Sequence, residues 1–328
     1  MSMMKAIALR AFGGPEVLRV EDMPRPEPGP GEVLVRVRGF GVNRFEALVR
    51  EGALGQVQFP LVPGVEAVGE IADANGTGLP EGARIATATG GMGRLRDGGY
   101  AEYLAIPAAQ VQLLKTEVPW SVLAGLPEIM QTAWGALHLG LRIEAGQTVL
   151  IRGGTTAVGL GAIGLAKVAG LRVIATTRKG DRAGLLKRHG ADEVIIDDGK
   201  IADRVSEIVS GGVDKALDIV GASTLIDTMK SVREDGAAAL VGMLGSKTAI
   251  ENFQPLFDLP SRVALVAYRG GMPEFMATPL QDIVDHIEAG RMVFEIGEVF
   301  DIERVAEAHR LMECNAAGGK IVVTLPDR

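Results

Sequence analysis

Two glycine clusters in the stretch "IRGGTTAVGLGAIGLAKVAG" are candidates for a phosphate-binding turn. The second, Gly159 to Gly164, fits the pattern G-x-G-x-x-G, and the first, Gly153–Gly154, does not complete that pattern. A phosphate-binding turn must directly follow the first strand of a β-α-β unit, because the free N–H groups of the next helix point at the pyrophosphate there. Strand "TVLIR" is expected to end at Arg152. We therefore predict the turn at 153–156 and a helix that begins near Ala157.

The residues of this turn have separate expected roles. Thr155 and Thr156 carry hydroxyl groups that can donate to phosphate, and Ala157 leaves room for backbone approach although glycine is usual there. The later glycines would lie inside the helix and allow it to pack closely on the strand; they are Gly159, Gly161 and Gly164. The alternative is a glycine-rich turn without a ligand, but a turn after the first strand favours phosphate.

The end of the second strand indicates which dinucleotide binds. A site for NAD usually has an acidic residue there to accept from the ribose 2′-OH. This chain has Thr176, Thr177 and Arg178, with Arg182 one turn later and no carboxylate before Asp181. A guanidinium group can bind a 2′-phosphate through two hydrogen bonds. The pattern favours NADP(H) over NAD(H), with a merely solvated basic cluster as the alternative.

Short apolar strands and helices alternate from about residue 148, and this predicts the fold around the turn. Repeated β-α-β units of this kind form a doubly wound parallel sheet with helices on both faces. The first third of the chain instead shows short alternating strands punctuated by glycine, which predict a compact, barrel-like β domain. After about residue 275 an amphipathic helix and the strand "GGKIVVTLP" are expected to rejoin that domain.

Composition excludes several classes of protein. The chain has 328 residues, a net charge of -7 and one cysteine. The charge argues against a nucleic-acid partner, and the single cysteine excludes internal disulfides and a thiolate zinc site. We find no signal peptide and no apolar run of membrane-spanning length, so a cytoplasmic location without a membrane partner is expected.

Several segments, in chain order, resemble the medium-chain dehydrogenase/reductase superfamily and its zinc-independent NADPH:quinone oxidoreductase-like branch. They are "GFGVNRFEALVREG", "FPLVPGVEAVGEI", "GGYAEY", "LPEIMQTAWGAL", "GADEVIIDDG" and "AHRLMECNAAGGKIVV". The resemblance covers nearly the whole chain. It implies a Rossmann domain at 121–274 and a mostly β, GroES-like catalytic domain at 1–120 and 275–328, with the nicotinamide in the cleft.

The resemblance also implies roles for individual residues. Asn43 would line the active site, Thr132 would contact the nicotinamide, and Lys320 would lie near the cleft at the cofactor. The pyrophosphate would be held by the turn from Thr155 to Val158. A further segment, Gly242, Met243 and Leu244, would pass close to the cofactor. Three positions depart from the family pattern: Asp197 replaces a cofactor-stacking tyrosine, and Arg44 and Glu46 replace proline and aspartate.

The residues that bind catalytic zinc in the alcohol-dehydrogenase branch are missing. Asn43 stands in place of a cysteine and Val65 in place of a histidine, so Glu66 remains alone. The four histidines are scattered and are expected on helix surfaces or in loops; they are His138, His189, His286 and His309. We predict no metal. Without a Lewis acid the acceptor must already be electrophilic, as quinones and conjugated carbonyl compounds are.

Other functions remain open at this point. The same fold could serve as a 2-enoyl-thioester or alkenal reductase, or as a non-catalytic regulator that binds NADPH or RNA. Asn43 could donate to the developing oxyanion or only tie down its own loop. The proton could come from solvent or from one of three tyrosines, Tyr100, Tyr103 and Tyr268. The β-rich run at 261–270 predicts a sheet edge and a homodimer formed through it.

Overall fold

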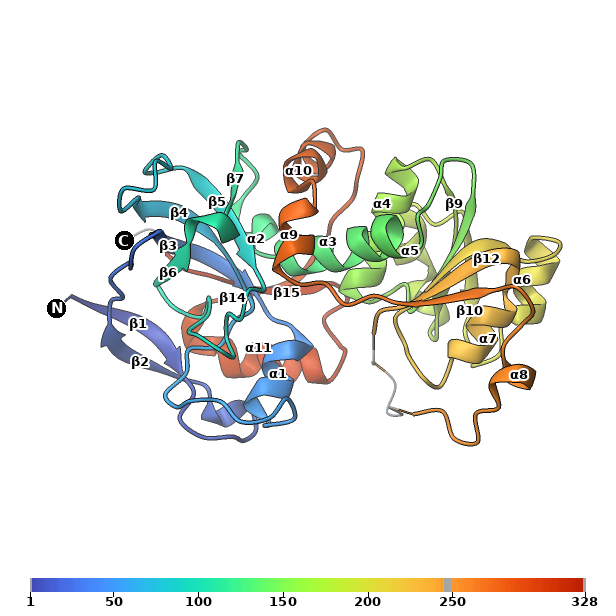
Figure 1. Cartoon of the computed structure of the whole chain (residues 1–328), viewed down its shortest axis with the longest axis horizontal. Coiled ribbons are helices and arrows are strands. Elements are labelled where there is room, and N and C mark those ends of the chain that lie inside the picture. Colours follow the sequence, from blue (N-terminus) through green and yellow to red (C-terminus); the bar gives the residue numbers. More distant parts are fainter. Residues whose placement is uncertain (1, 243, 245–248, 327–328) are drawn as a thin grey trace. The chain divides into compact units, whose positions relative to one another are not determined.

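The chain folds into two compact units in the computed structural model, which describes residues 2–242, 244 and 249–326 (Figure 1). One unit runs up to Glu128 and includes Gly271–Glu288 and the residues from Glu295 onward. The other comprises Ile129–Gly270 and Ala289–Phe294. The sequence placed the boundaries after residues 120 and 274, so the first lies later and the second earlier in the structure. A short return to the second unit at 289–294 was not expected.

The second unit is built on a parallel sheet of the predicted kind. Its strands are β8 (Thr148–Arg152), β9 (Arg172–Thr177), β10 (Glu193–Ile196), β11 (Val213–Asp218), β12 (Val232–Leu240) and β13 (Ala264–Ala267). They lie in the order β10-β9-β8-β11-β12-β13, and every neighbouring pair is parallel. The order reverses between β8 and β11, and this is where such sheets bind nucleotides. The doubly wound sheet is confirmed.

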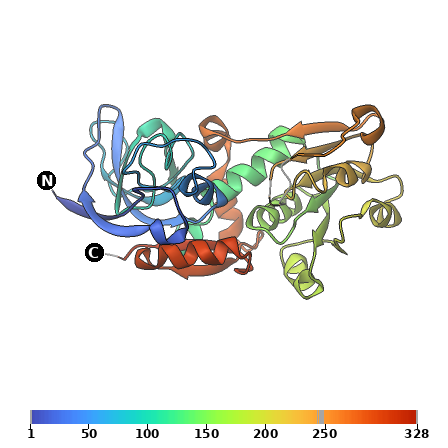
Figure 2. The same cartoon turned by 90° about the horizontal axis from the view of Figure 1, so that it is seen from below.

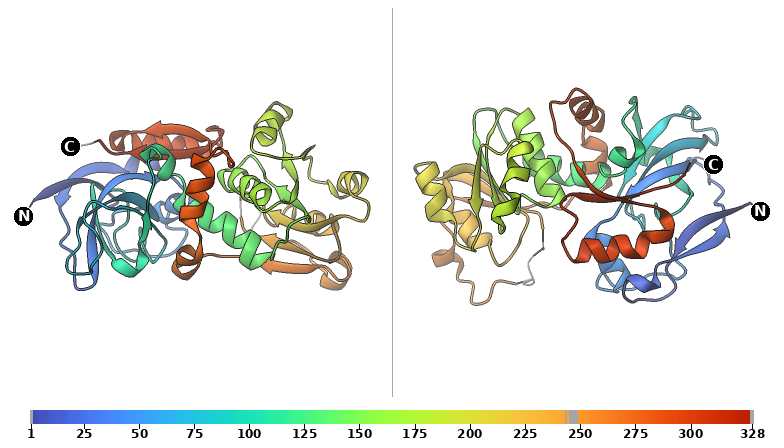
Figure 3. Two further views of the ribbon diagram at one scale, coloured as in Figure 1. Left: turned by 90° about the horizontal axis from the view of Figure 1, so that it is seen from above. Right: turned by 180° about the vertical axis from the view of Figure 1, so that it is seen from behind.

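Helices connect these strands and cover both faces of the sheet (Figure 3). They are α4 (Ala157–Val168), α5 (Ala183–Arg188), α6 (Ala202–Ile208), α7 (Leu225–Lys230) and the short α8 (Pro255–Asp258). The central strand β8 is apolar along most of its length because both of its faces are buried. Val149, Leu150 and Ile151 of β8 are all fully buried.

The first unit is mostly β. Its main sheet contains β3 (Glu32–Gly41), β4 (Glu66–Asp73), β5 (Arg84–Ala88), β6 (Tyr103–Pro107), β7 (Gln112–Leu114), β14 (Ile296–Phe300) and β15 (Lys320–Thr324). The order is β14-β15-β3-β4-β5-β7, with β6 also paired to β3. The terminal strand β15 therefore rejoins the N-terminal sheet, as predicted, and it brings with it β14, which was not predicted. A separate hairpin pairs β1 (Met3–Ala8) with β2 (Arg19–Pro24).

Helices from distant parts of the sequence complete this unit. They are α1 (Arg44–Arg50), α2 (Trp120–Leu123), α9 (Met272–Ala277), α10 (Leu280–Glu288) and α11 (Val305–Glu313). Helix α11 packs against α1 and the turn Pro15–Val17 (Figure 2). The buried core includes Ile7, Phe40, Ile85 and Ile106. This packing carries His309 of α11 into the interior of the unit.

The helical stretch after Pro119 is interrupted. Helix α2 ends at Leu123, α3 (Pro127–Trp134) begins at a proline, and a wider π-type turn follows at Gly135–Gly140. Proline suits the first turn of a helix because an N–H group at that position would have no carbonyl partner inside the helix. The predicted apolar stripe is buried throughout; its members are Leu123, Leu126, Met130, Ala133 and Leu137. In the part of the chain that is described, no helix is long and apolar enough to cross a membrane.

Candidate active site

The glycine turn lies where the sequence predicted it, directly after the first strand of the parallel sheet. Strand β8 ends at Arg152, and α4 begins at Ala157 with Thr156 as its N-cap. Gly153 has a φ of 85°, a conformation that residues with side chains rarely adopt. The formal G-x-G-x-x-G match is therefore inside α4.

Several polar groups of this turn are engaged within the protein. The N–H of Gly153 donates to Thr176 Oγ1 (3.1 Å), and that of Gly154 donates to the Thr176 carbonyl (3.0 Å). The Thr156 hydroxyl donates to the Gly153 carbonyl (2.9 Å) and accepts from the Gly159 N–H (2.9 Å). The hydroxyl group that we expected to donate to phosphate therefore closes the helix cap.

The first turn of α4 retains donors for an anion. The leading N–H groups of a helix have no carbonyl partner inside it, and the helix dipole makes that end positive. In α4 these are the N–H groups of Ala157 and Val158, and the side chain of Thr155 lies just before them. These three residues could contact a phosphate, whereas Gly153, Gly154 and Thr156 shape the turn.

The glycines inside α4 allow close packing, but their neighbours are the turn, α3 and Met292 and not the strand that we expected. A Cβ atom on Gly159 would lie 2.5 Å from the Gly153 carbonyl oxygen and 2.7 Å from that of Gly154. On Gly161 it would approach Ile129 at 3.2 Å, and on Gly164 it would lie 2.9 Å from Met292 Cγ. Gly159 therefore supports the turn directly, while Gly164 meets only a flexible side chain.

The end of β9 presents cations but no free hydroxyl groups. Thr176 and Thr177 are buried; Thr176 donates to Asp197 and Thr177 to the Lys179 carbonyl (3.1 Å). Arg178 is exposed and Arg182 is half-buried. Neither guanidinium has an ion-pair partner among the residues that the structure describes. Only the two arginines of the predicted set remain available to a 2′-phosphate.

A buried ion cluster lies beneath the turn, and the sequence did not reveal it. Arg152 binds Asp197 through Nε (2.8 Å) and Nη2 (2.9 Å), and it binds Asp227 through Nη1 (2.7 Å). Burial is the largest single influence and favours the neutral form of Asp197, but the hydrogen bonds and the positive charge of Arg152, together with the hydrogen bonds from Gly199 and Thr176, lower the pKa of this carboxyl. Asp197 also accepts from Thr176 (3.3 Å), which in turn holds Gly153. Asp197, which replaces a tyrosine of the family pattern, thus connects the end of β10 to β8 and to the glycine turn.

The remaining residues predicted near the cofactor lie at two further places in this unit. Gly242 follows β12, and a Cβ atom there would lie 2.1 Å from the Ile219 carbonyl oxygen. Met243 lies outside the described residues, and Leu244 is 37% exposed. Thr132 lies on α3, where its hydroxyl donates to Gln131 Oε1 (3.3 Å).

Three polar side chains meet inside the barrel unit and form a closed triad. Asn43, at the N-cap of α1, donates its Nδ2 to Glu66 Oε1 (2.9 Å). Lys320, at the start of β15, donates its Nζ to the same oxygen (3.0 Å) and to Asn43 Oδ1. The second Glu66 oxygen accepts from the Glu128 N–H (2.8 Å). The side chain of Asn43 therefore binds β4 and β15, and it does more than tie down its own loop.

Glu46 lies one helical turn after Asn43 and is also buried. Its carboxylate accepts from the N–H groups of Asn43 (2.9 Å) and Val65 (2.8 Å). Burial is the main cause that raises the pKa of Glu46 to about 7, and the nearby Glu66 adds to it. A glutamate at this position, in place of aspartate, thus joins α1 to the residue before β4.

A second row of polar side chains in close contact lies inside the same unit. His309 Nδ1 lies 3.2 Å from Arg50 Nη1, and His309 Nε2 lies 3.2 Å from the Tyr100 hydroxyl. The expectation of a helix surface or a loop is wrong for His309, which is buried within α11, whereas His189 lies in the turn after α5 but is also buried. The periodicity of the sequence does not predict the burial of His309, because its neighbours lie on α1 and on a loop far away in sequence.

Comparisons with known proteins support the sequence resemblance. Residues 29–116 match the family "Alcohol dehydrogenase GroES-like domain", and residues 157–282 match the family "Zinc-binding dehydrogenase". A quinone oxidoreductase from Pseudomonas aeruginosa is 29% identical over 98% of this chain and 99% of its own. The chain belongs to the medium-chain dehydrogenase/reductase superfamily.

Solved structures of superfamily members agree with this assignment. An NAD-dependent alcohol dehydrogenase is 28% identical, with a TM-score of 0.89 over 98% of this chain and 100% of its own. A mycobacterial protein complexed with NADPH is 27% identical, with a TM-score of 0.84 over the same shares. Within the superfamily this chain falls in the quinone oxidoreductase-like branch, and it is an oxidoreductase.

The superfamily includes zinc enzymes, but the residues here do not fit a zinc ion. Among the described residues no group of three His, Cys, Asp or Glu side chains could hold a metal. Zinc sites use such side chains as ligands. Near Glu66 the chain instead places Lys320, whose cationic Nζ is already bonded to this carboxylate.

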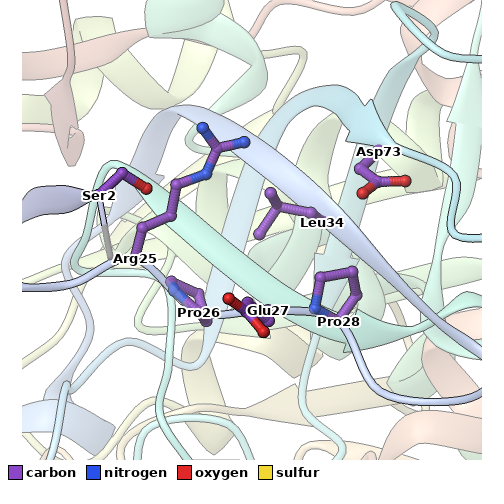
Figure 4. A pocket seen from close by; sticks show the side chains of 7 residues that line it. All are labelled: Ser2, Arg25, Pro26, Glu27, Pro28, Leu34 and Asp73. Carbon is purple, nitrogen blue, oxygen red and sulfur yellow. The ribbon is translucent and has the colours of Figure 1, made fainter.

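A surface pocket of about 200 Å³ in the barrel unit does not belong to this site (Figure 4). Arg25, Pro26 and Asp73 are among the residues that line it. The Arg25 guanidinium lies 3.9 Å from the centre of the Tyr103 ring, so it has a structural contact of its own. None of the candidate residues lines this pocket.

Proposed function

We propose that this oxidoreductase uses NADP(H) and transfers a hydride to a quinone or a conjugated carbonyl acceptor without a metal ion. The observation that carries the proposal is the triad of Asn43, Glu66 and Lys320. The ammonium group of Lys320 pairs with Glu66, the residue that remains of the zinc ligands of the alcohol-dehydrogenase branch. The acceptor must then be electrophilic by itself, because no Lewis acid polarises it. The relatives named quinone oxidoreductase support this class of acceptor.

The described residues fit a nicotinamide dinucleotide. Thr155, Ala157 and Val158 would bind the pyrophosphate at the start of α4, where N–H groups and the helix dipole favour an anion. Arg178 and Arg182 would bind a 2′-phosphate, and the chain from Thr177 to Gly180 contains no carboxylate that would bind a ribose 2′-OH instead. Thr132 would contact the nicotinamide end, and Gly242 and Leu244 would border the cofactor. The NADPH complex of a relative supports this choice.

The bound cofactor would supply the hydride, which carries two electrons and one proton. Asn43 would donate an N–H to the acceptor oxygen as negative charge develops on it. A second proton from solvent completes the reduction of a quinone to a hydroquinone. None of the three tyrosines is placed as an evident proton donor. Tyr100 binds His309, Tyr103 lies under Arg25, and Tyr268 is buried against Gln131.

A 2-enoyl-thioester or alkenal reductase, or a non-catalytic NADPH-binding regulator, would fit the same fold. An assay of NADPH and NADH oxidation with 9,10-phenanthrenequinone, 1,4-benzoquinone and an enoyl thioester separates these functions. We expect turnover of the quinones with NADPH. Turnover of the enoyl thioester alone would favour the first alternative, and NADPH binding without turnover of any acceptor would contradict the enzyme proposal.

The choice of cofactor has its own test. The double variant Arg178→Ala/Arg182→Ala should weaken NADPH binding and leave NADH binding unchanged, because only NADPH carries the 2′-phosphate. Arg19→Ala, an exposed arginine of the other unit, is the matched control. Equal losses for both nucleotides would refute a role in 2′-phosphate binding.

We also propose a homodimer formed through the segment 261–270. Strand β13 lies at the edge of the parallel sheet in the described structure, and Leu265 on it is exposed. Unpaired edge strands readily pair with a second chain. Sedimentation at micromolar concentration should show a dimer; a monomer would refute the proposal.

A further inference from the structure

The orientation of the Asn43 amide is fixed by its two partners. An amide oxygen only accepts hydrogen bonds and an amide NH2 only donates. Lys320 Nζ can only donate, so the Asn43 oxygen faces Lys320. The carboxylate of Glu66 can only accept, so Nδ2 faces Glu66 Oε1. This arrangement uses one N–H of the amide and leaves the second N–H without a partner among the described residues.

The backbone beneath the triad leaves room only for glycine. A Cβ atom on Gly41, at the end of β3, would lie 2.1 Å from Glu66 Oε1 and 2.7 Å from Lys320 Nζ. Any side chain at Gly41 would displace both charged groups. The missing side chain at Gly41 thus leaves the space in which Lys320 and Glu66 meet Asn43.

The burial of the triad increases its electrostatic effect. Glu66 is 0%, Lys320 3% and Asn43 8% exposed, so Asn43 is the most accessible member. Interactions between charges and dipoles are stronger in a buried environment than in water. A cation bonded to an amide oxygen polarises the amide, and its N–H groups become better donors.

We propose that Lys320 is a positioning residue, which orients and polarises the Asn43 amide toward the acceptor oxygen and does not bind the cofactor. This rests on the proposed function, because it requires an acceptor whose oxygen gains negative charge. It also reassigns Lys320, which the family resemblance places at the cofactor. Two of the three N–H groups of its ammonium are engaged by Asn43 and Glu66.

Binding and turnover of Lys320 variants test this role. In Lys320→Met we expect kcat/KM for a quinone to fall about 100-fold, the loss typical of a damaged oxyanion donor. The Kd for NADPH, measured by fluorescence titration, should not change. Lys320→Arg should recover part of the activity, because a guanidinium can also donate to both partners. Lys230→Met, at an exposed lysine of α7, is the matched control. A parallel rise in the Kd for NADPH in Lys320→Met would overturn the proposal.

A double-mutant cycle shows whether Lys320 acts through Asn43. If it does, Lys320→Met should add little to the loss caused by Asn43→Ala, since residues that share one function are not additive. Additive losses would show an independent role and overturn the proposal. Lys320→Gln, which keeps a polar group in the buried site, replaces the methionine variant should that variant not fold.

A measurement without any acceptor separates this inference from the proposed function. The side-chain NH2 signals of Asn43 in 1H–15N spectra, assigned by their loss in Asn43→Asp, should exchange slowly with water in the wild type. They should shift and exchange faster in Lys320→Met. Unchanged signals would overturn the positioning role. Lysine-dependent signals in a protein that turns over no acceptor would overturn only the proposed function.

Discussion

His309 Nε2 lies 3.2 Å from the Tyr100 hydroxyl, although 209 residues separate them in the chain. Arg50 lies on the other side of the ring, 3.2 Å from His309 Nδ1. Arginine only donates, so Nδ1 is the acceptor and a neutral His309 carries its proton on Nε2. Burial, helped by the charge of Arg50, lowers the pKa of His309 from 6.5 to about 3. The imidazole is therefore neutral in the folded protein at physiological pH.

This arrangement predicts how His309 affects stability with pH. Between about pH 3 and 6.5 the unfolded chain binds a proton at His309 that the folded protein does not bind. The free energy of unfolding should therefore rise with pH in this window, by about 1.4 kcal/mol per pH unit from this residue. In His309→Asn that contribution disappears. Urea unfolding of both proteins at several pH values measures it, and parallel curves would contradict the prediction.

Glu46 should have the opposite effect. The pKa of its carboxyl is about 7 in the folded protein and 4.5 when unperturbed. Between these values the folded protein holds the extra proton, so the free energy of unfolding should fall as pH rises, by about 1.4 kcal/mol per pH unit. Glu46→Gln should remove this fall. Because the two effects oppose each other between pH 4.5 and 6.5, a double variant with His309→Asn should have the same slope as the wild type in this window alone.

Loss of Arg152 should be strongly destabilising. Arg152→Met leaves Asp197 and Asp227 without their shared cation, and breaking a buried ion pair costs about 3–5 kcal/mol. Arg204→Met removes an exposed pair with Asp198 and should cost about 0–1 kcal/mol. Urea unfolding compares the two variants. Equal losses would show that the buried cluster does not stabilise the sheet.

Gly159 and Gly164 should respond differently to alanine. In Gly159→Ala the new methyl group meets backbone oxygens of the turn, which cannot rotate away. We expect weaker NADPH binding together with a lower Tm. In Gly164→Ala it meets the flexible Met292, and alanine favours a helix by about 1 kcal/mol over glycine. NADPH affinity should stay unchanged in Gly164→Ala. An equal loss of affinity in both variants would contradict our placement of the phosphate site at the turn before α4.

The sequence was sufficient to predict the elements whose signals are local. Short apolar runs that alternate with helical segments identified the parallel sheet, and the end of β8 at Arg152 located the turn. These predictions held because strand burial and helix capping depend on neighbours in the chain. The same local reasoning could not show which groups of the turn are free. The hydroxyl of Thr156 is satisfied by its own helix cap, and the N–H groups of Gly153 and Gly154 by a residue of the adjacent strand.

The polar clusters were decided only by the tertiary structure. The sequence supplied Asn43, Glu66 and Lys320 as separate residues of three segments, and Arg152 and Asp197 as the ends of two strands. The pairing of β15 with β3, and of β3 with β4, brings the first three together. A lone charge is costly to bury, whereas a paired and hydrogen-bonded charge can be buried. The sequence alone determined which charged residues are present, and strand pairing decided which of them could be buried as pairs.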